Sequence, residues 1–394
     1  MVTPGRPGAG DRWGRAVLPV AWDGPAPGRR LPTLSPVRVD QVIPSLASRD
    51  AIGVHTLALS RALRAAGIES DVFYGNCTPD VAAEGRPVTA LGRPGRDRYL
   101  LYQSSIGSPV FDILASRSEP KLVNYHNITP AALLEPWEPA VAFEAALGRA
   151  QLERLAPDCG LAVADSAFNA GELADAGYKE TAVVPLLIDM THAGAAPDPV
   201  VADRLAEEKA RGGAELLFVG KVSPHKAPHD LVKMLAVYRR LYDGRARLRL
   251  VGSPLGTSYG PALEAFVADV GLTDAVIVTG SLDAAGLEAH YRAADVFVCA
   301  SEHEGFCVPI VEAMGHGVPV VAYGTAAVPE TVGSAGIVLP GKDPVRFAAA
   351  VARVMGDAGL RARLASAATR RVADFGLERS TARFVELVRR AVGA

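Results

Sequence analysis

Two glutamates and two lysines stand where the chain is expected to leave buried strands and enter helices. Glu304 and Glu312 are eight residues apart, on either side of the expected start of a short helix. Such a pair of carboxylates could supply the acid and the base of a hydrolase, or could accept hydrogen bonds from hydroxyl groups of a bound molecule. Lys221 and Lys226 lie in another loop, where two ammonium groups could neutralise a diphosphate. The residues alone leave both kinds of chemistry open.

The segment from residue 295 to residue 324 has the pattern of a strand, an acidic loop, a helix and a second strand. DVFVCAS and VPVVAY are apolar runs typical of buried parallel strands, and Pro309 suits the first turn of the helix between them. The first N–H groups of a helix have no partner inside it, so those at 306–310 would point outward. The pattern therefore predicts an anion site at the N-terminus of this helix.

Strands alternate with helices on both sides of this segment, which predicts a doubly wound α/β chain. The first half opens with a strand over 37–43, a loop that contains Gly53 and a helix over 54–67. A later strand over 121–127 carries His126 near its end. The second half opens with ELLFVGK, and the two lysines follow it. Ligands of such sheets bind at the carboxyl ends of the strands. Gly53 is either a phosphate contact or a plain turn residue, and His126 either faces a cleft or is packed at a strand end.

Composition and charge exclude several classes of protein. A chain of 394 residues exceeds one typical core, so we expect two domains. A net charge of −2 gives no electrostatic reason to bind nucleic acid. The four cysteines lack paired spacing, which favours reduced thiols in a cytoplasmic protein. No apolar run approaches the roughly 20 residues that span a bilayer, while contact with a membrane surface stays open.

Motif searches narrow the chemistry further. The sequence contains no metal-binding cysteine and histidine motif, so we predict no metal and no other cofactor. The G-x-S-x-G motif of a serine nucleophile is absent. The G-x-G-x-x-G motif is absent as well, which disfavours a dehydrogenase that uses a dinucleotide.

These residues together resemble the retaining glycosyltransferases of family 4, which have the two-domain GT-B fold. The most specific part is EGF at Glu304 followed by EAM at Glu312, and then GVPVVA and VPE. The loop from Lys221 to Lys226 resembles the family's diphosphate-binding loop, and YHNITP at 125–130 resembles a histidine motif of bacterial members. The resemblance covers the chain from about residue 37 onward.

The resemblance implies a role for each position. Glu304 would hold hydroxyl groups of a donor sugar, Glu312 would hold the ribose, and Lys226 with Lys221 would stabilise the departing nucleoside diphosphate. His126 would lie near the reacting carbon. The predicted catalytic residues are His126, Lys226 and Glu304. The predicted donor-binding residues are Gly53, Lys221, Lys226, Gly280, Ser281, Leu282, Glu304, Gly305, Phe306, Cys307, Val308 and Glu312.

The resemblance also implies an architecture and a function. We expect two Rossmann-like domains that face each other across a cleft, with a C-terminal helix that crosses back to the first domain. The expected parts are an irregular extension (1–36), an acceptor domain (37–190), a linker (191–213), a nucleotide-sugar domain (214–375) and the returning helix (376–394).

The expected reaction is the metal-independent transfer of a hexose-type sugar, with retention of configuration, from a UDP- or GDP-sugar to a hydroxyl of a small molecule or glycan. Two alternatives remain, a sugar-nucleotide epimerase of the same fold and a non-catalytic protein that binds nucleotide sugars.

Overall fold

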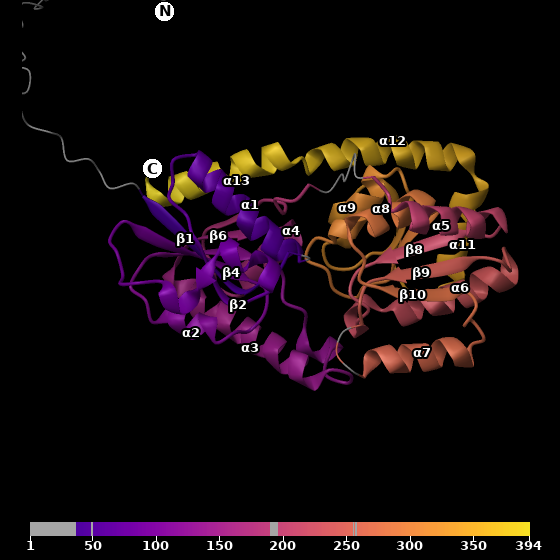
Figure 1. The fold of residues 1–394 in the computed structure, drawn as a ribbon, viewed down its shortest axis with the longest axis horizontal. Coiled ribbons are helices and arrows are strands. Elements are labelled where there is room, and N and C mark those ends of the chain that lie inside the picture. Colours follow the sequence, from indigo (N-terminus) through magenta and orange to yellow (C-terminus); the bar gives the residue numbers. More distant parts are fainter. Residues whose placement is uncertain (1–36, 49, 190–195, 255, 257) are drawn as a thin grey trace, which may run out of the picture. The chain divides into compact units, whose positions relative to one another are not determined.

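The computed structural model describes residues 37–48, 50–189, 196–254, 256 and 258–394 (Figure 1). The predicted extension over 1–36 and the first residues of the predicted linker lie outside this range. Within it, the strands form two parallel sheets, one of seven strands and one of six. The α/β class and the two Rossmann-like domains expected from the sequence are therefore confirmed.

The first sheet has the strand order β3-β2-β1-β4-β5-β6-β7, and all of its pairs are parallel. Its central strands are buried on both faces, as covering helices require, and every residue of β5 is buried. The strands are β1 (Arg38–Leu46), β2 (Val72–Cys77), β3 (Arg86–Pro87), β4 (Arg98–Ser104), β5 (Lys121–Tyr125), β6 (Cys159–Ala164) and β7 (Thr181–Val183).

Helices connect these parallel strands. The α-helices are α1 (Ala51–Ala65), α2 (Val110–Ala115), α3 (Pro139–Leu155) and α4 (Ala167–Asp175). Short 3-10 helices lie at η1 (Pro79–Glu84), η2 (Val88–Ala90), η3 (Ala131–Leu133) and η4 (Ala156–Asp158).

The first strand and the first helix differ from the sequence prediction at their boundaries. We expected a strand over 37–43 and a helix over 54–67, but β1 continues to Leu46 and α1 begins at Ala51. Pro44 is tolerated inside the strand because β4 pairs with β1 only as far as Val42. Gly53 consequently lies in the first turn of α1 and not in the preceding loop.

The second sheet has the order β10-β9-β8-β11-β12-β13, again with parallel pairs. Its strands are β8 (Glu215–Val219), β9 (Arg247–Val251), β10 (Val276–Gly280), β11 (Val296–Cys299), β12 (Val320–Tyr323) and β13 (Gly336–Leu339). Its helices are α5 (Pro199–Ala210), η5 (Pro224–Lys226), α6 (Pro228–Leu241), α7 (Tyr259–Asp269), α8 (Ala284–Ala293), α9 (Val308–Gly315), α10 (Val328–Val332), α11 (Pro344–Gly356) and α12 (Ala358–Asp374).

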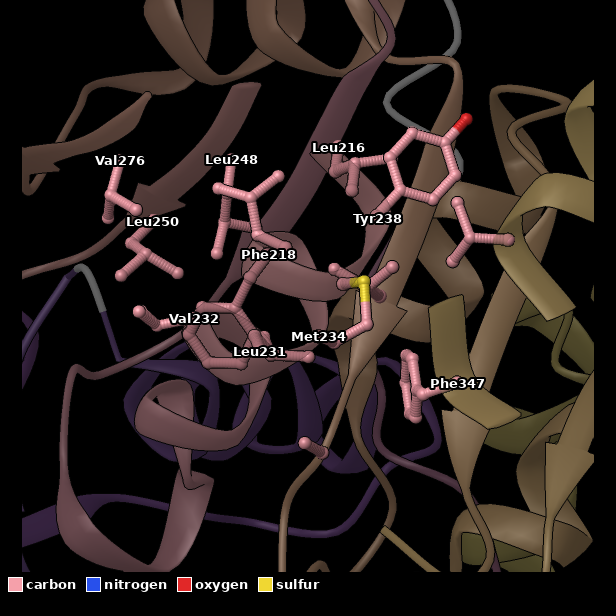
Figure 2. Close-up of a cluster of buried hydrophobic side chains, with 14 of the residues drawn as sticks. Leu216, Phe218, Leu231, Val232, Met234, Tyr238, Leu248, Leu250, Val276 and Phe347 are labelled. Carbon is pink, nitrogen blue, oxygen red and sulfur yellow. The ribbon is translucent and has the colours of Figure 1, made fainter. Parts of the chain in front are cut away.

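Alternating residues of the second sheet enter two different cores. Leu216 and Phe218 of β8 pack with α6 and α11, as Figure 2 shows for the side chains around Met234. Leu217, between them, belongs to the core that contains the apolar residues of α9. Successive residues of a strand point to opposite faces, so one short run of apolar residues holds helices on both sides of the sheet.

Some short elements were missed at the sequence level. The two residues of β3, the four of β13 and the six of α2 are too few to show a periodic pattern. In the folded chain, β13 pairs in parallel register with β12.

The helix α13 (Leu377–Val392) packs on the first sheet, although the second sheet lies between the two in the sequence. Its buried residues Phe384 and Val388 share a core with Val39 of β1 and Leu59 of α1. Tyr99 also donates a long 3.5 Å hydrogen bond to the carbonyl of Val392. None of the helices in the described ranges has both the length and the apolar character needed to cross a membrane.

Candidate active site at the carboxyl ends of β8 and β11

An ion pair joins the two loops that the sequence singled out. The strands β8 and β11 are neighbours in the second sheet, so the loops that follow them meet at one edge. Lys226 Nζ lies 2.7 Å from both carboxylate oxygens of Glu304. The Glu304 side chain is only 6% exposed and that of Lys226 is 21% exposed. Burial disfavours the charge on Lys226, yet the Glu304 carboxylate outweighs it and raises the pKa of Lys226.

The backbone is strained close to several of the predicted site residues. In the described ranges, the non-glycine residues with positive φ are Asn127, Ala227, Cys307 and Ala326. Two of them directly follow His126 and Lys226, and a third lies three residues after Glu304. Conformations of this kind cost about 1–3 kcal/mol and cluster at functional sites. The strain therefore supports this sheet edge as the candidate site.

The N-terminus of α9 lies directly after the loop that holds Glu304. The helix begins at Val308 with Cys307 as its N-cap residue, at φ 69°. The Ile310 N–H donates to the Cys307 carbonyl at 3.0 Å, so our expectation of outward N–H groups over 306–310 was too broad. Proline has no N–H, which removes position 309 as well. The N–H groups of Phe306, Cys307 and Val308 stay the predicted anion contacts.

Gly305 must be a glycine because the first domain approaches it closely. A Cβ atom at this position would lie 2.5 Å from the Asn127 Cβ and 2.9 Å from the Asn169 Nδ2. Those two asparagines are joined by a 2.8 Å hydrogen bond. The strand end after β5 and the start of α4 therefore contact the Glu304 loop, which places part of the first domain beside the candidate site.

Glu312 has a partner that sequence reasoning missed. The Tyr291 hydroxyl on α8 donates to the Glu312 carboxylate at 2.7 Å. Glu312 is 7% exposed and Tyr291 is 1% exposed. Burial and the neighbouring Glu312 carboxylate raise the pKa of Tyr291 well above its usual value. The two residues are 21 positions apart in the sequence, and no local motif connects them.

His126 lies in a buried chain of hydrogen bonds whose direction follows from its first link. Gln41 Nε2 donates to the Thr56 carbonyl at 2.9 Å, so the Gln41 oxygen faces Gln103 and accepts from its Nε2 at 2.6 Å. The Gln103 oxygen then lies 2.6 Å from His126 Nε2. A carbonyl oxygen only accepts, so His126 Nε2 must carry a proton.

The other ring nitrogen of His126 faces a carboxyl group. His126 Nδ1 lies 3.0 Å from Asp165 Oδ2, with the two side chains 1% and 2% exposed. Burial raises the pKa of Asp165, whereas His126 opposes this shift. Because Nε2–H is committed to Gln103, a proton must lie between Nδ1 and the carboxyl group. Both nitrogens of His126 are thus engaged, and its direct role at a reacting carbon stays a prediction.

A second buried histidine connects this network to the segment that leaves the first domain. The His55 ring lies 5.1 Å from the ring of His126 and accepts a 2.9 Å hydrogen bond from the Leu187 N–H at Nδ1. Burial, assisted by His126, lowers the pKa of His55 well below its usual value. Neither His55 nor Asp165 was identified from the sequence, although Asp165 directly follows β6 and the rule of strand ends could have found it.

The remaining predicted contacts lie at the ends of other elements. Gly53 in α1 packs so tightly that a Cβ there would lie 2.3 Å from the Ala47 carbonyl oxygen. Lys221 is exposed and is not drawn into the ion pair of Lys226. Gly280 ends β10 with φ 72°, and the Ser281 hydroxyl, next to Leu282, lies 2.9 Å from that of Ser253. Their roles as donor contacts stay predictions.

Two thiols that the sequence separates also meet at this edge. Cys299 ends β11 and Cys307 precedes α9, and the loop between them carries Glu304. The interaction between the two thiols lowers the pKa of Cys299 and raises that of Cys307, and burial adds to the second shift. The Cys299 thiol itself donates a 3.3 Å hydrogen bond to the Ser301 hydroxyl. The spacing of the two cysteines in the sequence did not predict that they would meet.

The part of the chain that forms this sheet edge matches a known protein family. The model of the family described as "Glycosyl transferases group 1" matches residues 213–357, which include the Lys226–Glu304 pair and Glu312. Residues 213–357 form a group 1 glycosyltransferase domain. The resemblance to family 4 and to the GT-B fold is confirmed by this match together with the relatives below.

The curated relatives of the group 1 domain include D-inositol 3-phosphate glycosyltransferases. That of Geodermatophilus obscurus is 34% identical over 243 residues, which are 58% of this chain and 52% of the relative. That of Salinispora arenicola is 31% identical over 256 residues, or 61% and 57% of the two chains. The chain thus spans about half the length of the curated relatives it matches.

Solved structures extend the likeness in fold beyond the group 1 domain. HepE of Anabaena, in complex with UDP and glucose, has a TM-score of 0.70 and 17% identity over 89% of this chain and 99% of its own. Sucrose-phosphate synthase from Thermosynechococcus elongatus has a TM-score of 0.69 and 19% identity over 90% and 98%. At these identities the likeness concerns the fold.

Proposed function

We propose that this protein is a retaining glycosyltransferase that moves a hexose-type sugar from a nucleoside-diphosphate sugar to a hydroxyl acceptor without a metal ion. The observation that carries the proposal is the ion pair between Lys226 and Glu304 beside the N-terminus of α9. It supplies a cation for a diphosphate and a carboxylate for sugar hydroxyls within one hydrogen-bond length of each other. A hydrolase would use two carboxylates, but here Glu304 is bonded to a lysine and Glu312 to a tyrosine.

The donor would separate the ion pair and satisfy both of its members. Its diphosphate would take Lys226, together with the N–H groups at the start of α9, and the sugar hydroxyls would donate to Glu304. Glu312, oriented by Tyr291, would accept from the ribose. As the bond between the anomeric carbon and the diphosphate oxygen breaks, Lys226 would stabilise the negative charge on the leaving group.

The acceptor would attack from the same face as the leaving group. Its hydroxyl oxygen would form the new bond to the anomeric carbon, and its proton would pass to a departing phosphate oxygen. This route needs no enzymic nucleophile and retains the configuration. The protein would contribute orientation and charge stabilisation, and part of the acceptor site would come from the first domain at Asn127 and Asn169, beside Gly305.

We infer UDP- or GDP-sugars as donors and test UDP first, because HepE was solved with UDP and glucose. The relatives' names make a phosphorylated polyol such as inositol 3-phosphate one acceptor to include in a panel. Simple sugars, glycans and other hydroxyl compounds complete that panel.

Thermal unfolding with UDP-, GDP-, ADP- and dTDP-sugars tests donor binding. A true donor at about 100 times its Kd stabilises by about 2.7 kcal/mol. With that donor and the acceptor panel, NMR of the product shows whether the anomeric configuration is retained, and repeating the assay with a chelator tests metal independence. Absence of any stabilising nucleotide sugar, or isomerisation of the donor without acceptor, would contradict the proposal.

A further inference from the structure

The edge of the second sheet holds a cluster of three metal-ligating side chains that the proposed reaction does not use as a unit. Ligand atoms of Cys299, Glu304 and Cys307 all lie within 4.8 Å of one another. Cys299 is the last residue of β11, and Glu304 and Cys307 come from the loop that follows it. We propose that these residues form a binding site for a thiophilic divalent cation such as Zn²⁺.

The donor set suits such a cation. Zinc binds thiolate sulfur at about 2.3 Å and carboxylate oxygen at about 2.0–2.2 Å, so its ligand atoms lie roughly 3.5–4 Å apart in tetrahedral geometry. The present spread of at most 4.8 Å therefore needs only small shifts of side chains. Two sulfurs and one oxygen leave a fourth position for water. Hard cations such as Mg²⁺ prefer oxygen ligands alone, so the two sulfurs select against them.

The charges around the cluster balance when a divalent cation is added. Two thiolates and the Glu304 carboxylate carry three negative charges, and Lys226 with a divalent cation carries three positive charges. A carboxylate has lone pairs for several partners, so one oxygen of Glu304 can keep Lys226 while the other binds the metal. Cysteine binds a metal as its thiolate. Binding would therefore release the thiol protons.

The backbone at Cys307 supports a use for its thiol. Its φ of 69° and ψ of 69° lie in the left-handed region, where glycine would be free of strain. A cysteine in this conformation costs about 1 kcal/mol or more. Cys299 is 1% exposed, whereas Cys307 is partly exposed and offers the cation a path from solvent.

One consequence of the site rests on the proposed function. A cation on the Glu304 oxygen would occupy the position that a donor-sugar hydroxyl needs. The metal would then act as an inhibitor of transfer and not as its cofactor. Binding itself does not depend on the reaction, so it is tested without a sugar donor.

The test uses the reduced full-length protein and Cd²⁺, whose bonds to thiolates absorb in the ultraviolet. We expect one Cd²⁺ per chain with this absorption, and Zn²⁺ should displace it. Cys299→Ser and Cys307→Ser should each lose most of the absorption and bind Zn²⁺ at least about tenfold more weakly in competition with a chromophoric chelator. Glu304→Gln should weaken Zn²⁺ binding and keep the absorption.

The other two cysteines provide matched controls. Cys77 and Cys159 are also partly buried free thiols, but they belong to the first sheet. Cys77→Ser and Cys159→Ser should bind both metals as the unchanged protein does. Circular dichroism confirms that each variant is folded. Unchanged binding in both Cys299→Ser and Cys307→Ser, loss of binding in a control variant, or no binding to the fully reduced protein would overturn the proposal.

Discussion

Replacing Lys226 with methionine separates the structural role of the ion pair from its proposed chemical role. Lys226→Met keeps a long apolar side chain and leaves the Glu304 carboxylate, 6% exposed, without its cation. Breaking a buried ion pair in this way costs about 3–5 kcal/mol. The lysine side chain is 21% exposed, so water screens the pair in part and we expect the lower end of this range. For a domain of this size, a loss of about 3 kcal/mol lowers the unfolding midpoint by roughly 6–12 °C.

The double variant Lys226→Met with Glu304→Leu serves as the matched control. With both charges gone, no uncompensated carboxylate stays buried, and most of the lost stability should return. Activity should not return, because the leaving diphosphate still lacks its cation. We expect turnover in Lys226→Met to fall by about 10²–10³-fold, as for the loss of one preorganised donor, and to stay low in the double variant.

The assay pairs thermal unfolding with initial rates of sugar transfer, on all variants at one pH and one donor concentration. Two outcomes would refute the reasoning. If Lys226→Met unfolds at the temperature of the unchanged protein, the ion pair does not stabilise the fold. If the double variant regains activity along with stability, Lys226 serves the fold and not the leaving group.

Three further predictions concern the scaffold around the site. Gly53→Ala should destabilise the fold by about 1–3 kcal/mol, because its Cβ would lie 2.3 Å from a backbone oxygen. Gly171→Ala in α4, with open space around it, should stabilise the fold by about 0.5–1 kcal/mol. Urea unfolding measures both changes in unfolding free energy, and changes of the same sign would contradict the packing argument. Burial lowers the pKa of His55, so below a pH of about 6.5 the unfolded chain gains a proton there and the folded chain does not, and the free energy of unfolding falls by up to about 1.4 kcal/mol per pH unit. His55→Gln should therefore reduce the pH dependence of stability measured by urea unfolding between about pH 6.5 and 5.5. An unchanged pH dependence would show that His55 also titrates in the folded protein. Phe384→Ala should lower the unfolding free energy by about 3–5 kcal/mol because the ring is fully buried. Leu377→Ala, at a position 39% exposed, should lower it by less than about 0.5 kcal/mol in the same measurement. Similar losses of stability in the two variants would argue against the packing of α13.

The alternation of strands and helices predicted the fold class, because period and run length depend on neighbours along the chain. The rule that ligands bind at strand ends also singled out the Lys226 loop and the Glu304 loop as candidate sites. The direct ion pair between Lys226 and Glu304 could not be predicted in this way, because the positions of strand ends do not give distances between side chains. The hydrogen bond from the Tyr291 hydroxyl to Glu312 could not be predicted from the sequence for the same reason.

The largest gap between sequence and structure lies at His126. The predicted strand over 121–127 included His126, whereas β5 ends at Tyr125 and His126 follows it directly. The environment of His126 is set by residues from β1, β4 and the end of β6 that only the folded sheet brings together. Sequence reasoning also treated the cysteines one at a time, and the fold places Cys299 beside Cys307.

The packing of α13 has a consequence for the order in which the protein can fold during synthesis. Arg389 of α13 donates to the carbonyl of Ala66, 323 residues earlier in the chain. The first sheet leaves the ribosome early, but the core that contains Val39 and Leu59 stays incomplete until Phe384 has emerged. The whole second sheet must be translated in the meantime. The first domain therefore completes its core last, and a chain that stalls before α13 exposes a surface prone to aggregation.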